Sequence, residues 1–367
     1  MASVDFNSQF SRTDRLLHRM AFNGVEVQKT LADIEDRMHA RELARITIER
    51  PVFVTSLPRA GTTFLLECLA ALPEFTTHSY RRMPFLLCPL LWERVSRGLR
   101  KKSELSERAH ADGMLVSSDS PEAFEEALWM AFWPQKYGAG RISAWSRTDR
   151  DPEFENFFKS HIRKLILLSQ HEGKEATRYV SKNNANIARL PLLREIFPDA
   201  IILLPFREPF AHASSLLRQH ENFLRIHAAD GFGRDYMRAI GHLEFGQLLH
   251  RITLVPDDGR SRYAPTELEY WLEYWSETFE RLLKSDCRNI HFVSYERMCA
   301  EPDSAAELLQ GILGDGSLAN IRAQVSQVHA PTEYPIHEGA ATSRELRRAE
   351  TVYRELLAVA ENGRPRP

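Results

Sequence analysis

One segment constrains the fold of this chain more than any other: a β-rich run that passes through a tight loop into a helix. Residues 51–57, PVFVTSL, are typical of a buried strand. The loop 58–63, PRAGTT, follows, and the apolar run 64–72 predicts a helix that ends before Pro73. The order strand, loop, helix is typical of α/β proteins, so this segment already favours that fold class.

The same alternation continues along the chain. Further strands are predicted at 178–181, 200–204 and 290–295. Helices are predicted within 7–48, from Ser120-Pro121 to about 133, up to 197, from about 209 to 220, from a capping box at 266–269, after 302 and from 343 onward. Strands that alternate with helices predict an α/β fold, in which helices flank a parallel sheet on both faces.

Composition limits the classes of partner. The chain has 367 residues and a formal net charge of −2, which gives no overall indication of nucleic-acid binding. The four cysteines lack metal-ligand spacing and are interpreted as reduced thiols, which favours a cytoplasmic location. The N-terminus does not resemble a signal peptide, and no apolar run approaches the roughly 18 residues of a membrane-spanning helix. We therefore expect a soluble protein whose anion site is built locally; peripheral membrane contact and homo-oligomerisation stay open.

The loop after the first strand has the chemistry of an anion site. A helix begins there, so backbone N–H groups without partners point outward and favour an anion. Gly61 lets the backbone approach a ligand closely, and Thr62 and Thr63 add hydroxyl donors. Arg59 adds a permanent positive charge with a forked set of donors. These residues could hold a terminal phosphate, or a sulfate that leaves one.

Other interpretations of this loop stay open. The Walker A pattern G-x-x-x-x-G-K-[ST] is absent and no lysine precedes the two threonines, which counts against a P-loop small-molecule or nucleotide kinase without excluding it. A non-catalytic nucleotide-binding protein is the alternative from another class. A plain strand-to-helix turn with an exposed arginine is the simplest structural explanation. No G-x-S-x-G elbow supports a serine hydrolase.

A second pair of residues could complete such a site. Arg207 closes the predicted strand at 200–204, and Ser215 lies eight residues later in the predicted helix. Together they could reach one phosphate from the end of a neighbouring strand. Alone, the pair fits a strand-ending arginine and a helical serine equally well.

These motifs resemble one family. Residues 57–65, LPRAGTTFL, resemble the 5′-phosphosulfate loop of sulfotransferases that use PAPS (3′-phosphoadenosine-5′-phosphosulfate), in the P-R-[SA]-G-T-T form of bacterial members and tyrosylprotein sulfotransferases. Residues 197–209 with Ser215 are similar to the family's 3′-phosphate segment, and 295–298 with Pro302 to its late Y-E-x-hydrophobic element. The resemblance runs in order over about 50–310. It implies a P-loop NTPase-like fold.

The resemblance also implies roles. The donor site would comprise Arg59, Ala60, Gly61, Thr62, Thr63 and Phe64 around the 5′-phosphosulfate, Arg207 and Ser215 at the 3′-phosphate, and Tyr295 near the nucleotide. The reaction would transfer a sulfuryl group from PAPS to a hydroxyl, less readily an amine, of a carbohydrate, lipid or other small molecule. PAP would be the product, and no metal would be needed. Two departures are that cytosolic members carry lysine in place of Arg59, and that their glycine-rich C-terminal element is not evident here.

The domain prediction follows from these boundaries. Residues 1–48 are expected to form an N-terminal helical segment, and 49–367 a single sulfotransferase domain. Within it, a mostly helical insertion at about 76–175 would lie on the acceptor side.

A hydroxyl acceptor needs a general base. The sequence offers four candidates, His78, His110, Glu122 and Glu126, of which His110 and Glu126 are the preferred catalytic residues beside Arg59. Glu122 and Glu126 would share one face of the helix predicted after Ser120. An isolated histidine or a run of glutamates is more often ordinary polar surface, so the choice stays open.

The acceptor is only hinted at. Basic residues at 81–82 and 97–102 could meet an anionic glycan, a lipid headgroup or only water. Lys182, just past a predicted strand, could face the donor or simply solvent.

Overall fold

A five-stranded parallel sheet organises the molecule. The computed structural model describes residues 11–97, 106–107, 115–116, 120–254, 261–285, 289–314, 316–328 and 344–362. The strands are β1 Val52–Val54, β2 Phe75–Thr76, β7 Arg178–Lys182, β8 Ile201–Phe206 and β10 Ile290–Ser294. Their order is β10-β8-β1-β7-β2, and every neighbouring pair is parallel. The strands predicted near 51–57, 178–181, 200–204 and 290–295 are confirmed.

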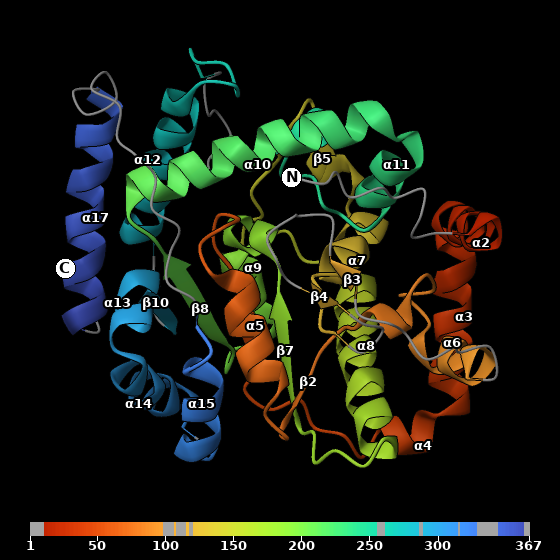
Figure 1. Ribbon diagram of the computed structural model, residues 1–367. Helices are drawn as coiled ribbons and strands as arrows, with labels where there is room; N and C mark the ends of the chain where they lie inside the picture. Colours follow the sequence, from red (N-terminus) through yellow and green to blue (C-terminus); the bar gives the residue numbers. More distant parts are fainter. Residues whose placement is uncertain are drawn as a thin grey trace.

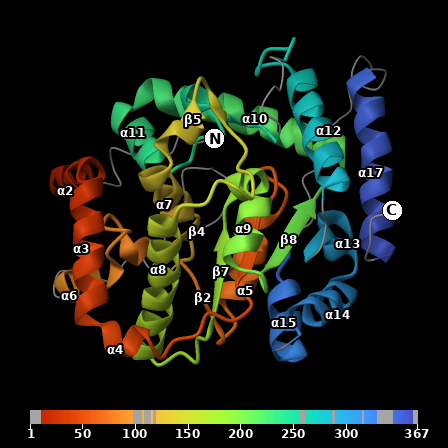
Figure 2. The same cartoon turned by 180° about the vertical axis from the view of Figure 1, so that it is seen from behind.

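Helices cover both faces of this sheet, as predicted (Figures 1 and 2). Side chains alternate along β1, so Val52 and Val54 pack on one face and Phe53 on the other. The Val52 face carries α5 (Thr62–Ala70), α13 (Tyr295–Ala300), α14 (Pro302–Leu313) and α15 (Leu318–Val325). The Phe53 face carries α8 (Pro152–His171), α9 (Leu190–Ile196), α10 (Pro209–Ala229) and α12 (Leu268–Lys284). The architecture is an α/β fold in which two layers of helices enclose a five-stranded parallel sheet.

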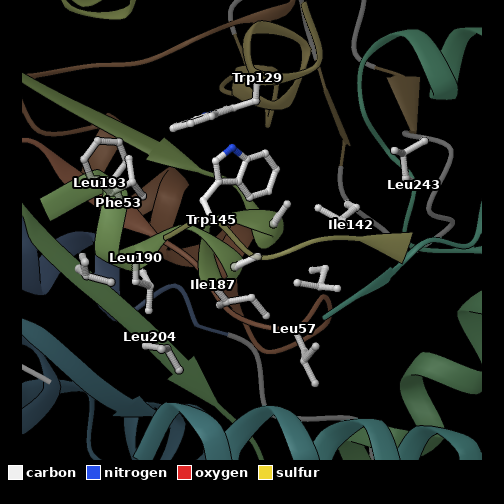
Figure 3. Packing of buried hydrophobic residues seen from close by; sticks show 14 of the residues in the cluster. Phe53, Leu57, Trp129, Ile142, Trp145, Ile187, Leu190, Leu193, Leu204 and Leu243 are labelled. Atoms are coloured by element: carbon white, nitrogen blue, oxygen red, sulfur yellow. The ribbon is translucent and has the colours of Figure 1, made fainter. Parts of the chain in front are cut away.

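The larger core lies on the Phe53 face. Figure 3 shows Phe53 and Leu193 near Trp129 and Trp145, which come from the segment between β2 and β7. Trp129 and Trp145 are both almost fully buried. The core therefore joins the sheet to the segment that was predicted as an insertion.

That segment is mostly helical but less regular than the sheet. Its elements are η1 (Tyr80–Arg82), α6 (Pro89–Ser96), β3 (Ser106–Glu107), β4 (Leu115–Val116), α7 (Glu125–Phe132), η2 (Pro134–Lys136), β5 (Tyr137–Gly138), β6 (Arg141–Ile142) and α8. The start predicted for one helix is wrong, because α7 begins at Glu125 and not at the Ser120-Pro121 pair. Residues 120–122 instead run beside 78–80: Tyr80 N–H donates to Ser120 O, and Glu122 N–H donates to His78 O.

The N-terminal helices are tied into the body of the protein. They are α2 (Arg12–Asn23), α3 (Val25–Met38) and α4 (Ala40–Leu43). On α3, Ala32 and Glu35 are fully buried, and Lys164 of α8 bonds to both: its Nζ lies 2.8 Å from Ala32 O and 3.1 Å from Glu35 Oε2. Because a buried ammonium needs such partners, this contact fixes α3 against α8. That residues 1–48 form a separate helical segment stays a prediction.

The remaining elements complete the Phe53 side. They are η3 (Asn184–Ala188), α11 (Gly231–Ala239), η4 (Gly246–Leu248), β9 (Arg251–Ile252) and α17 (Arg344–Asn362). The predicted capping box at 266–269 is wrong, because α12 has no side-chain cap and the Glu267 carboxylate accepts from Ala264 N–H instead. α17, the charged helix predicted at the C-terminal end, packs against α12. Of the helices in the described ranges, none is both long and apolar enough to cross a bilayer.

Candidate active site

The loop between β1 and α5 lies at the carboxyl edge of the sheet. Gly61 is the N-cap of α5 and has a left-handed backbone, with φ of 93°. No side chain caps the helix, and its first turn holds no acidic residue. Because the first N–H groups of a helix have no partner within it, this end of α5 suits an anion. The predicted order of strand, loop and helix is confirmed, and the binding of an anion by the loop stays a prediction.

Tyr295, the first residue of α13, closes one side of the loop. A Cβ atom placed on Gly61 would lie 2.4 Å from Cδ2 of the Tyr295 ring. Only glycine fits there, because of both this contact and the positive φ. Tyr295 thus lies beside the loop; its place near a bound nucleotide, which the resemblance implies, stays a prediction.

Replacing Gly61 by alanine should distort this loop. The added methyl group must displace the Tyr295 ring, since its closest approach would be 2.4 Å. We expect nucleotide affinity to fall on the order of tenfold or more, while the fold, monitored by circular dichroism, persists. Gly173→Ala is the matched control, because Gly173 also has a positive φ but a Cβ there would meet no atom within 4 Å. Equal effects of the two changes on affinity would contradict the close contact.

The two predicted phosphate-binding groups meet at this loop. Arg59 Nε donates to Ser215 Oγ over 3.3 Å, and Arg207 Nη1 donates to the Arg59 carbonyl over 3.1 Å. Arg207 follows β8 and Ser215 lies in α10, so neighbouring strand ends bring these residues together. The sequence separates Arg59 from Ser215 by 156 positions.

Arg207 carries the clearest indication of a ligand. Its side chain is buried, yet neither Nε nor Nη2 has a hydrogen-bond partner among the described residues. The Glu296 carboxylate is 3.8 Å from Nε, and the guanidinium lies 5.3 Å from the centre of the Tyr295 ring. Burial raises the pKa of Glu296, which weakens it as a counter-charge. Buried donors of this kind are normally satisfied, so an anion is the natural partner here.

Glu126, one preferred base, is held in a buried ion pair. Arg189 Nη1 lies 2.8 Å from Glu126 Oε2, and Arg189 Nη2 lies 2.9 Å from Oε1. Tyr137 OH and Asn183 Nδ2 also donate to the same carboxylate. The Arg189 guanidinium lies over the rings of both Trp129 and Trp145, at 4.3 Å from each centre. The glutamates of this segment are therefore not a solvated face.

The other base candidates differ in their surroundings. His78 is buried against His161, with the two Nε2 atoms 2.9 Å apart, and burial lowers the pKa of His78 to about 3. Glu122 accepts from Tyr80 OH and from Ala123 N–H. Lys182 ends β7 beside Val54 of β1, next to the loop. His110 lies outside the described residues.

Glu125 was missed by the sequence analysis. It is fully buried and accepts from Tyr179 OH at 3.0 Å and Asn186 Nδ2 at 2.9 Å. Asn183, which bonds to Glu126, also has its N–H on Val54 O at the end of β1. A buried polar network therefore reaches the loop from the insertion. Only the Glu125-Glu126 doublet and the asparagines after β7 could have indicated it.

Within the described ranges, no group of three or more His, Cys, Asp or Glu residues could hold a metal ion. The groups that the loop presents are arginine, hydroxyl and backbone N–H donors, which are groups that bind anions.

One protein family and several solved structures match this chain. The sulfotransferase family matches residues 51–314. Sulfotransferase STF1 from Mycobacterium tuberculosis H37Rv is 15% identical, with 91% of this chain and 84% of that chain covered and a TM-score of 0.48. STF9 from Mycobacterium avium is 15% identical over 89% and 81%, with a TM-score of 0.48. A sulfotransferase from Alicyclobacillus acidocaldarius is 13% identical over 87% and 98%, with a TM-score of 0.39. No curated protein matches. Because the family match covers more than half of its length, the chain belongs to the sulfotransferase family.

Proposed function

We propose that this enzyme transfers a sulfuryl group from PAPS to a hydroxyl group of a small-molecule acceptor such as a carbohydrate or lipid. One observation carries the proposal: buried Arg207, beside Arg59 and Ser215, presents two donors that have no hydrogen-bond partner in the described part of the chain. A 3′-phosphate is the feature that separates PAPS from ATP. Arginine and serine donors beside a helix start suit a nucleotide with phosphates at both its 3′ and 5′ positions.

Different residues of the site bind different parts of the donor. The N–H groups at the start of α5 and the hydroxyls of Thr62 and Thr63 bind the 5′-phosphate. Arg207 and Ser215 bind the 3′-phosphate. Ala60 and Phe64 shape the loop, and the Tyr295 ring, which lies against Gly61, limits its width.

Sulfuryl transfer is an in-line displacement at sulfur. The acceptor oxygen forms a bond to sulfur while the bond from sulfur to the bridging oxygen breaks, and PAP leaves with that electron pair. Arg59 and the loop N–H groups stabilise the charge that develops on the bridging oxygen. Holding the acceptor and donor in line contributes most of the remaining rate enhancement, as in phosphoryl transfer.

The acceptor hydroxyl must lose its proton to a base, and the predicted bases stay Glu126 and His110. Arg189 holds the Glu126 carboxylate through both of its terminal nitrogens. His78 is a poor base because burial lowers its pKa to about 3. Single replacements of Glu126 and His110, with kcat and PAP affinity measured separately, distinguish the two, because loss of a base lowers kcat and leaves nucleotide affinity unchanged.

The proposal predicts that PAP binds without a metal ion. We expect calorimetric titration in EDTA to give a dissociation constant for PAP in the micromolar range or below, and much weaker binding of ADP with or without Mg²⁺. If ADP bound only with Mg²⁺ and PAP did not bind, the protein would be a kinase. If PAP bound but no acceptor from a broad hydroxyl and amine panel were sulfated, a non-catalytic nucleotide-binding role would replace this one.

A further inference from the structure

His212 of α10 is a buried titratable residue that lies directly beneath the loop. Its Nε2 atom is 2.7 Å from the Pro58 carbonyl oxygen, and its Nδ1 atom is 3.0 Å from Trp275 Nε1 of α12. Both His212 and Trp275 are fully buried. A continuous chain of hydrogen bonds thus runs from α12 through α10 to the backbone of the loop.

The indole fixes the state of the imidazole. Trp275 Nε1–H can only donate, so His212 Nδ1 must accept. The single proton of the neutral ring is then on Nε2, from which it donates to Pro58 O. Burial, together with the nearby Arg207, lowers the pKa of His212 to about 3. The ring therefore keeps this neutral form at every pH at which the protein would work.

This contact sets the direction of the loop backbone. The carbonyls of Pro58 and Arg59 both accept from groups at β8 and α10: His212 Nε2 and Arg207 Nη1. In a trans peptide the N–H points opposite to the C=O. The N–H groups of Arg59 and Ala60 must therefore point away from these two side chains. Arg59 reaches this conformation with φ of 69°, which is unusual for a residue other than glycine.

We propose that His212 and Trp275 are positioning residues of the donor site, which turn the loop carbonyls inward so that its N–H groups face the 5′-phosphate. The inference rests on the proposed function. His212 is three residues from Ser215 on the same helix, so α10 aligns both ends of the nucleotide. Neither residue touches the substrate.

Two substitutions of similar size separate the two ends of the hydrogen-bond chain. In His212→Gln, the amide nitrogen occupies about the place of Nε2 and can still donate to Pro58 O. In His212→Asn, the amide oxygen takes about the place of Nδ1, so the Trp275 contact survives and the Pro58 contact is lost. Each variant loses one buried hydrogen bond, so both should lose similar stability. We expect His212→Gln to bind PAP within about threefold of the wild type, and His212→Asn to bind on the order of tenfold more weakly.

Trp275→Phe tests the tautomer. It removes the donor to Nδ1, and we expect a roughly threefold to tenfold loss of PAP affinity. Trp271→Phe is the matched control on the same helix, because Trp271 Nε1 donates to Pro265 O away from the loop. Histidine ¹⁵N shifts of the wild type, assigned through His212→Gln, should show a neutral Nε2–H ring.

The outcomes separate this inference from the proposed function. A Nδ1–H or protonated His212, or equal PAP affinities for His212→Asn and His212→Gln, would overturn the positioning role while wild-type PAP binding stands. A wild-type protein that binds no PAP would overturn the proposed function, and the positioning role with it.

Discussion

Arg207→Ala should remove the preference of the enzyme for PAP over 5′-AMP. The 3′-phosphate is the only difference between the two ligands, and Arg207 has two buried donors with no hydrogen-bond partner among the described residues. Charge-assisted hydrogen bonds of this kind contribute about 1.5–3 kcal/mol each. We therefore expect PAP affinity to fall about 100-fold, to the level of 5′-AMP, and 5′-AMP affinity to stay nearly unchanged. Calorimetric titration of both ligands measures the effect.

Arg225→Ala is the control for this change. Arg225 lies on the same helix, α10, but is exposed, so its removal changes the net charge equally without altering the site. We expect less than a twofold effect on PAP affinity. An Arg207→Ala protein that still distinguished PAP from 5′-AMP would contradict the assignment of the 3′-phosphate.

Glu126→Ala should destabilise the protein more than any surface change. It would leave the Arg189 guanidinium fully buried without its counter-charge and would remove acceptors from Asn183 and Tyr137. Removing one partner of a buried ion pair costs about 3–5 kcal/mol. We expect the free energy of unfolding to fall by that amount in urea titrations followed by tryptophan fluorescence.

Glu280→Ala provides the comparison. Glu280 also forms a two-pronged pair with an arginine, Arg348, at 2.7 and 2.8 Å, but this pair joins α12 and α17 at the surface. Exposed pairs contribute about 0–1 kcal/mol because water screens both charges. If Glu126→Ala lowered the free energy of unfolding no more than Glu280→Ala, the buried ion pair would contribute no more to stability than the exposed one.

The sequence predicted the sheet well because its strands are short apolar runs between turn residues. Residues 52–54 and 201–206 have almost no exposed surface, so their hydrophobic pattern is continuous and easy to detect. The helix expected from Ser120 was wrong for a tertiary reason. Its first residues pair with 78–80 instead, and no local propensity encodes that contact.

The residues of the site also differ in how far the sequence reveals them. The proposed donor loop is contiguous, so residues 58–64 could be singled out in the sequence from their residue types and from the family resemblance. The buried contacts of Arg189 and His212 join positions 63 and 154 residues apart and could not be identified from the sequence. Neither residue stands out in the sequence, because an isolated arginine or histidine is more often exposed than part of a buried network.

A crystal structure of the enzyme with PAP would show directly whether the two phosphates bind where we propose. We expect the 5′-phosphate at the start of α5, within hydrogen-bond distance of Thr62 and Thr63. We expect the 3′-phosphate on the Arg207 donors and the Ser215 hydroxyl, with the Tyr295 ring still against Gly61. A nucleotide bound elsewhere, or a 3′-phosphate out of reach of Arg207, would contradict the proposal.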